Sequence, residues 1–189
     1  MADFDRGMVT NVGQGDCFVG DEPYLTFSTV LGSCVAACVR DTESGMGGMN
    51  HFLLASPSDM ARDRYGESAR YGAFAMEQLI NSVLTRGGGR KSCLQFKIFG
   101  GGMITAALSD IGAKNIAFVR QFLSDEGYDI AAEDVGGSFA RRLMYKPSSG
   151  RAFVKRLDSA MGVSVANAEL AIASVSTPWR SKSGEVELF

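Results

Sequence analysis

The chain alternates between short runs of apolar, β-branched and aromatic residues and clusters of glycine, proline and polar residues. Residues 24–31 and 35–39 are two such apolar runs and predict neighbouring strands, with the polar stretch 41–45 as the turn that closes a hairpin. Residues 46–54 predict the next strand. The same pattern allows a short edge strand at 17–19 and predicts strands at 94–99, 130–135, 141–145 and 151–157, the last two joined by a proline- and glycine-bearing turn.

Two longer segments repeat their apolar residues at intervals of three and four, the period of an amphipathic helix. The first covers residues 69–84 and ends at the glycines 87–89. The second begins after Ser109 and Asp110, whose side chains supply capping oxygens, and runs to Gly127. A short third helix is predicted at 167–173. Because strands outnumber helices and cluster along the chain, we predict an α+β fold: mostly antiparallel strands in mixed sheets, flanked by two main helices.

Composition limits the class of protein. A chain of 189 residues with 46% hydrophobic residues buries one sizeable core and needs no second domain. The formal net charge of −2 gives no basic footprint for nucleic acid, and there is no run of about 18 apolar residues to insert into a membrane. The N-terminus lacks the basic-then-apolar pattern of a secretory signal. We therefore expect a cytoplasmic protein whose four cysteines are reduced thiols.

One stretch carries candidate chemistry. Cys34 follows Gly32 and Ser33 at an abrupt break between two strand-like runs, and His51, the only histidine in the chain, lies on the next predicted strand. A cysteine and a histidine are the minimum set for thiol nucleophilic catalysis, because the imidazole takes the thiol proton and returns it to a leaving group. Neighbouring antiparallel strands would bring the two side chains together.

The sequence around these two residues resembles the signature of the CheD family of bacterial chemoreceptor glutamine deamidases. The resemblance rests on STVLGSCVAACVRD (28–41) and GGMNHF (47–52), and continues in ARYGAFAMEQLIN (69–81), FKIFGGGM (96–103), IGAKNIAFVRQFL (111–123), AEDVGGSFARRL (132–143) and KPSSGRAFVKRL (146–157). It fades after residue 158. We therefore divide the chain into a CheD-like deamidase domain at 1–158 and a C-terminal extension at 159–189, and expect part of the extension to be flexible.

This resemblance implies a CheD-like cysteine hydrolase that converts glutamine side chains of methyl-accepting chemotaxis receptors to glutamate, with Cys34 as nucleophile, His51 as base and no cofactor. It also implies binding to CheC, a phosphatase that couples the family to adaptation. In the family a threonine or serine stands six positions before the cysteine, and here that residue is Ser28. We therefore assign Ser28 to orient the imidazole, with Thr26 and Thr29 as alternatives.

Gly32, Ser33 and Asn50 are further candidates for binding the oxyanion or the substrate. The backbone N–H groups at Gly32, Ser33 and Cys34 lie in the turn and remain free to face a developing negative charge. Asn50 stands beside the histidine and is an alternative for orienting the ring, as an amide does in papain-like proteases, although adjacent strand residues point apart.

Other classes of function stay open at this point. The same surface fits a non-catalytic module that docks receptors or other chemotaxis proteins, and the same residues fit a thiol hydrolase that acts on a different amide or ester. Cys34, Cys38 and His51 also form a three-ligand pattern for zinc, but no fourth ligand stands at a recognisable spacing. We therefore expect no bound metal.

Overall fold

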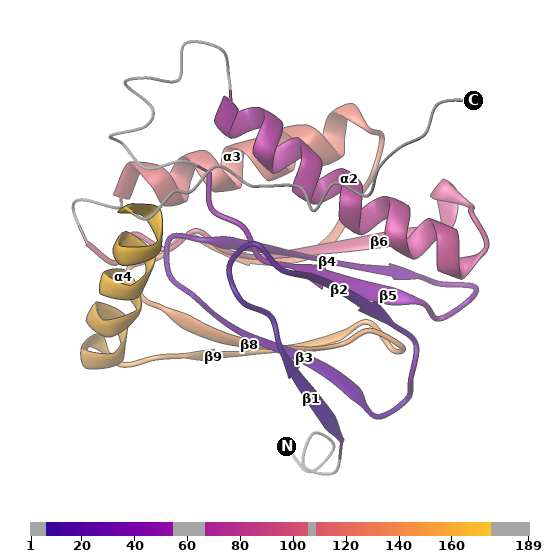
Figure 1. The fold of residues 1–189 in the computed structure, drawn as a ribbon, viewed down its shortest axis with the longest axis horizontal. Coiled ribbons are helices and arrows are strands. Elements are labelled where there is room, and N and C mark those ends of the chain that lie inside the picture. The colour runs from indigo at the N-terminus through magenta and orange to yellow at the C-terminus, as the bar shows by residue number, and fades with distance from the viewer. Residues whose placement is uncertain (1–6, 55–66, 106–108, 175–189) are drawn as a thin grey trace, which may run out of the picture.

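The computed structural model describes residues 7–54, 67–105 and 109–174, which form two β-sheets and three α-helices (Figure 1). The four-stranded sheet has the order β1 (Met8–Asn11), β3 (Leu25–Leu31), β8 (Arg141–Lys146), β9 (Arg151–Arg156). The five-stranded sheet has the order β2 (Cys17–Gly20), β5 (Gly47–Asn50), β4 (Val35–Asp41), β6 (Leu94–Gly100), β7 (Ile130–Val135). The helices are α2 (Glu67–Gly87), α3 (Ser109–Asp125) and α4 (Ser159–Ser174), and a 3-10 turn, η1, covers Lys91–Cys93.

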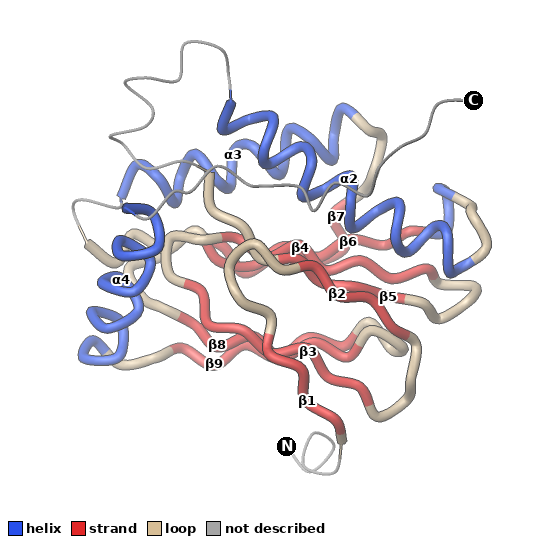
Figure 2. Tube along the Cα trace, in the orientation of Figure 1, coloured by secondary structure: helices blue, strands red, loops and turns tan. Residues whose placement is uncertain are grey.

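The elements are stacked in layers (Figure 2). Helices α2 and α3 lie on one face of the five-stranded sheet, the four-stranded sheet lies against its other face, and α4 stands at one end of the two sheets. Strand β4 is therefore covered on both faces, which explains why its sequence is apolar without alternation. Val35 and Ala37 pack toward the helices, whereas Cys34 and Ala36 belong to the core between the sheets.

The predicted fold class is confirmed: the sheets are mixed and mostly antiparallel, with parallel pairing only at β1–β3 and β6–β7 within the described residues. The two main helices form where the apolar period placed them. The third helix is longer than the predicted 167–173, and β1, which pairs only with β3, was not predicted from its exposed, mixed sequence. The polar residues 55–68 indicate a loop, most of which lies outside the described residues. The division of the chain at 158 stays a prediction.

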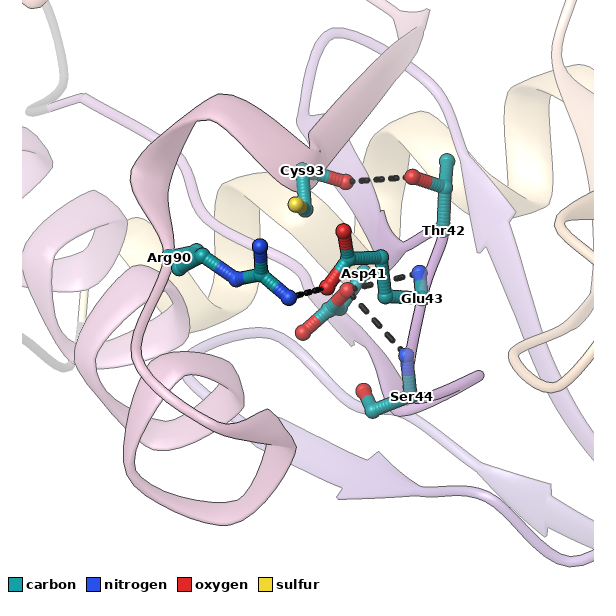
Figure 3. Close-up of polar contacts among 6 residues, drawn as sticks. All are labelled: Asp41, Thr42, Glu43, Ser44, Arg90 and Cys93. Carbon is teal, nitrogen blue, oxygen red and sulfur yellow. Dashed lines mark hydrogen bonds and ion pairs between the residues drawn. The ribbon is translucent and has the colours of Figure 1, made fainter.

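The predicted turn at 41–45 joins β4 to β5 (Figure 3). The Asp41 carboxylate accepts hydrogen bonds from the backbone N–H groups of Glu43 (2.9 Å) and Ser44 (3.3 Å), the local arrangement for which aspartate is favoured in turns. Glu43 also forms an ion pair with Arg90, which follows α2. These contacts close the hairpin at the end of β4 opposite the Cys34 turn.

All four cysteines lie within the described residues, and all four are free thiols. Cys34 and Cys38 are buried, while Cys17 and Cys93 are half-buried. Across the described ranges, no helix has both the length and the apolar character needed to span a bilayer.

Candidate active site

The turn between β3 and β4 holds Cys34 in a fixed, fully buried position. Two backbone hydrogen bonds clamp it to the glycine loop that follows β6: Gly101 N–H donates to the Cys34 carbonyl and Gly102 N–H to the Gly32 carbonyl, both at 2.7 Å. Gly100 has a φ of +108°, and a Cβ there would lie 2.2 Å from the Cys34 carbonyl oxygen. Only glycine fits this close approach, so the loop supports the turn that carries the cysteine.

Strand register brings Cys34 and His51 to the same side of the five-stranded sheet. Beyond β5 the pairing with β4 continues through a bridge in which Val35 and Phe52 exchange backbone hydrogen bonds of 3.0 and 2.9 Å. In this antiparallel register Ala36 stands opposite His51, so Cys34 is its diagonal neighbour on the same face. Diagonal neighbours in such a pair lie about 7–8 Å apart at Cα, within reach of long side chains.

Hydrogen bonds fix the tautomer of the His51 ring. Thr29 Oγ1 lies 2.9 Å from Nδ1 of the ring and donates its own proton to the Val12 carbonyl at 2.7 Å. That hydroxyl has only one proton, so it accepts from Nδ1–H, and the Val12 carbonyl, 3.3 Å from Nδ1, also requires a proton there. The proton on Nδ1 leaves Nε2 as the basic nitrogen. This atom is buried and has no hydrogen-bond partner among the described residues.

Burial lowers the pKa of His51, against weaker opposing effects of the Val12 carbonyl and of nearby carboxylates. The imidazole is therefore neutral at neutral pH. A neutral ring with a free Nε2 is the state that a general base needs.

The hydroxyl on the ring belongs to Thr29, which corrects the assignment of Ser28. On β3 the side chains of Leu25, Phe27 and Leu31 enter the core between the sheets, and strand alternation puts Thr29 on that face with them. Ser28 and Thr26 lie on the opposite face, and the Thr26 hydroxyl has no hydrogen-bond partner among the described residues. The spacing of the family motif favoured Ser28, whereas the direction in which the side chains point favours Thr29.

A small cavity has both His51 and Thr29 in its wall. Its volume is about 250 Å³. It is lined by Asn11, Val12, Gly13, Ser28, Thr29, Val30, His51 and Arg142. Ser28 therefore contributes to the same cavity wall as the histidine, although its hydroxyl is not the one that contacts the ring.

The backbone around Cys34 forms a nest of N–H groups, and a carboxylate occupies it. Glu169 of α4 accepts hydrogen bonds from the N–H groups of Gly32 (2.9 Å), Ser33 (2.9 Å) and Cys34 (3.3 Å), and from the Ser33 hydroxyl (2.6 Å). The N–H groups predicted to face an oxyanion thus bind an anion in the structure. Nothing in the sequence pattern pointed to Glu169, although it is the only charged residue between 159 and 174.

The environment of Cys34 keeps its thiol protonated. Burial raises the pKa of Cys34 well above its ordinary value, and the negative charge of Glu169 raises it further. The Sγ–H group lies 3.6 Å from Gln14 Oε1, to which it donates a weak hydrogen bond. The site therefore holds a neutral thiol and a neutral imidazole rather than an ion pair.

Asn50 does not reach this site, which corrects its candidacy. Its Oδ1 accepts a hydrogen bond from Ala37 N–H at 3.0 Å, and its Nδ2 donates to the Ala75 carbonyl of α2 at 2.9 Å. The side chain is thus buried on the helix side of the sheet, as alternation relative to its neighbour requires. Asn50 joins β4, β5 and α2 and does not contact the substrate side.

A second asparagine, missed by the sequence analysis, supports the site from α3. The Asn115 side chain is fully buried; it donates from Nδ2 to the Ser33 carbonyl and accepts from Leu54 N–H at Oδ1, both at 2.8 Å. It thereby ties the cysteine turn to the segment that follows His51. The one signal for Asn115 in the sequence was an asparagine among the apolar positions of a predicted amphipathic helix.

The described residues contain no group of three or more histidine, cysteine, aspartate and glutamate side chains arranged to hold a metal ion. The alternative zinc site at Cys34, Cys38 and His51 therefore has no complete ligand set within these ranges.

Comparison with known proteins places this site in a family context. A family model described as "CheD chemotactic sensory transduction" matches residues 53–156. "Probable chemoreceptor glutamine deamidase CheD" from Caulobacter vibrioides strain NA1000 is 50% identical over 149 residues, covering 79% of this chain and 78% of the relative. The protein of the same name from Caulobacter sp. strain K31 is 46% identical over 179 residues, covering 95% and 92%.

The likeness to solved structures is much weaker. The crystal structure of the hypothetical protein YfiH from Bacillus licheniformis matches with a TM-score of 0.42 and 15% identity, over 67% of this chain and 58% of that one.

The matched region of the family model begins two residues after His51. This match therefore does not cover Cys34 or His51.

Proposed function

Because this chain belongs to the CheD family, we propose that it hydrolyses the side-chain amide of specific glutamines in methyl-accepting chemotaxis receptors to glutamate, using Cys34 and His51. The observation that carries the proposal is the neutral His51 ring, with Nε2 free, on the same face as a cysteine whose own N–H belongs to an anion-binding nest. Nucleophile, base and oxyanion donors are the three parts that acyl transfer requires.

In the first half of the reaction His51 Nε2 takes the proton of the Cys34 thiol while the sulfur attacks the carboxamide carbon. The C=O electron pair moves onto the oxygen, and the N–H groups of the nest stabilise this negative charge. The imidazolium then gives its proton to the amide nitrogen. Ammonia leaves, and the receptor side chain remains bound to Cys34 as a thioester.

Water completes the second half. His51 Nε2 removes a proton from the water as its oxygen adds to the thioester carbon, and the nest again holds the oxyanion. The sulfur leaves as the thiolate and recovers its proton from the imidazolium, which releases the glutamate side chain. One water is consumed and one ammonia is produced for each glutamine, and no cofactor enters either step.

The resting protonation states determine how the thiol is activated. Burial raises the pKa of Cys34 and lowers that of His51, so the proton stays on sulfur until substrate arrives. Attack and proton transfer must therefore be coupled, as in serine hydrolases, rather than start from a preformed thiolate.

The proposed substrate also indicates where the enzyme works. Its methylation sites lie in the helical cytoplasmic region, so an enzyme that forms glutamates there works in the cytoplasm. A CheC-type phosphatase is the second proposed partner, on the strength of the family resemblance alone. A pure adaptor is the competing function, but it would not need an oriented imidazole beside a buried thiol.

The proposal is tested by incubating the full chain with a purified receptor cytoplasmic fragment and measuring intact and peptide masses. We expect a gain of about one mass unit per modified glutamine in ordinary water and about three in H₂¹⁸O, because hydrolysis of the thioester adds one solvent oxygen to the new carboxylate. The control is the same chain after its thiols have been blocked under denaturing conditions and the protein refolded. A receptor that binds but keeps its mass with the unblocked chain would favour the adaptor.

Changing Thr29 to valine should lower the deamidation rate about tenfold, because the ring loses the oxygen that accepts from Nδ1–H while the Val12 carbonyl remains. The fraction of the ring protonated on Nε2 should rise, which ¹⁵N NMR of the single histidine reports. The matched comparison is Ser28→Ala, from which we expect the smaller loss. A larger loss from Ser28→Ala would return the orienting role to Ser28.

A further inference from the structure

The C-terminal helix α4 places its only charge in the proposed active site. Among its sixteen residues, Ser159–Ser174, Glu169 is the one ionisable side chain, and only 5% of it is exposed. Among the described residues, the hydrogen bonds that the Glu169 carboxylate accepts come from the turn at Gly32, Ser33 and Cys34, more than 130 positions earlier in the chain. A charge is buried only where its hydrogen bonds compensate for lost hydration, so this contact is specific.

Other described residues of α4 also contact the rest of the protein. Ala166 is fully buried in the core between the sheets, and Gly162 packs near Ile104, where a Cβ would lie 3.5 Å from the Ile104 side chain. Met161 and Val163 remain 45% and 53% exposed. These apolar contacts and the glutamate together join the helix to one end of the sheets.

The group that fills the nest has the chemistry of the reaction product. Deamidation of a helix-borne glutamine yields a helix-borne glutamate, and its carboxylate must leave from the N–H groups that held the oxyanion. Glu169 presents such a carboxylate from a helix, with Oε1 accepting from the Cys34 N–H itself. Its side chain has the same length as that of the product.

We propose that α4 is an autoinhibitory element: Glu169 occupies the site of the substrate's carboxamide as an intramolecular product analogue, and a receptor helix must displace it. This inference rests on the proposed function and adds the regulation of the same site. The enzyme then exists in a closed state with the nest filled and an open state with the nest available.

The electrostatics of the closed state agree with inhibition. The Glu169 charge raises the pKa of the Cys34 thiol, whereas an activating group would lower it. If Glu169 took part in catalysis, its charge would oppose thiolate formation. Its carboxylate also accepts the hydrogen bonds of the N–H groups that the oxyanion requires. Removing the side chain should relieve both effects.

The first test is Glu169→Ala in the full chain, with Glu77→Ala on the exposed face of α2 as the matched loss of one carboxylate. We expect Cys34 in the Glu169 variant to react with iodoacetamide about tenfold faster than in the parent, and receptor glutamines to be deamidated faster by a similar factor, with Glu77→Ala unchanged in both. Near-ultraviolet circular dichroism identifies any variant that has failed to fold.

The two readouts separate the inference from the proposed function. If the parent deamidates receptor and a folded Glu169→Ala variant is no faster in either assay, autoinhibition is overturned while the function stands. If Cys34 alkylation accelerates but no receptor is modified by either protein, the nest is occupied as inferred and the proposed function fails instead.

A second variant tests the contact without any receptor. In Glu169→Gln one carboxylate oxygen is replaced by an NH₂ group, which cannot accept from the Ser33 N–H, so the docked helix loses its charge and one hydrogen bond. We expect Cys34 in this variant to be alkylated faster than in the parent. A folded Glu169→Gln chain whose Cys34 reacts at the parent's rate would overturn the inference.

Discussion

Replacing Cys34 with alanine is expected to lower the rate of receptor glutamine deamidation by at least about a thousandfold, because no other group in the site forms the thioester. The substitution removes a buried thiol that donates a weak hydrogen bond to Gln14, so the fold should be retained. Quantitative peptide mass spectrometry of the receptor measures the rate. The same samples, treated with hydroxylamine, should yield a receptor hydroxamate with the parent chain and none with the variant.

Cys38→Ala is the matched control for this experiment. Cys38 is also a fully buried thiol on β4, and it lies in the same core between the sheets. Losing its sulfur should cost about 1 kcal/mol of unfolding free energy and leave the deamidation rate per folded molecule unchanged. Equal losses from the two substitutions would mean that the Cys34 effect is one of packing, and would remove the nucleophile from the proposal.

The sequence predicted that Cys34 and His51 lie on neighbouring strands because both positions depend on short-range patterns. An apolar run without alternation marks β4 as buried on both faces, and a polar turn then fixes β5 as its antiparallel neighbour. These two facts determine the register, and the register determines which side chains share a face. Because the chain contains a single histidine, His51 was the only histidine that could be the base.

The orienting hydroxyl was assigned one residue too early because motif spacing carries no information about strand faces. Ser28 and Thr29 are adjacent, similar in chemistry and both buried. Only the partners of β3 decide between them: the residues on either side of Thr29 that enter the inner core, Phe27 and Leu31, fix its direction. A face assignment from the apolar residues of β3 alone would have selected Thr29.

The contact made by Glu169 is a different kind of omission. It joins residues separated by 137 positions, through a helix whose apolar residues show no clear one-sided period and whose docking therefore cannot be predicted from its sequence. An isolated glutamate in such a segment would ordinarily be placed in solvent. The buried N–H groups that it contacts belong to the turn that joins β3 of one sheet to β4 of the other.

Replacing His51 with glutamine should lower the deamidation rate at neutral pH by about 10²- to 10⁴-fold, the usual contribution of a positioned base. Glutamine keeps polar atoms near the Thr29 hydroxyl and the Val12 carbonyl, so the loss should not be one of folding. Thermal unfolding checks this point. Cys34 should still be alkylated at high pH in the variant, because hydroxide in solution removes the thiol proton without help from the ring.

The pH dependence separates the base from a merely structural histidine. Burial lowers the pKa of His51 below the ordinary value of about 6.5, so the parent's rate should rise with pH only on the acid side of that value and then level off. The variant has no base to titrate, and its rate should instead rise about tenfold per pH unit through neutral pH as thiolate forms. Since the chain has a single histidine, proton NMR gives its pKa without assignment, and it should match the acid limb of the parent's profile. A parent rate that follows the variant's slope would show that hydroxide, and not the imidazole, accepts the Cys34 proton.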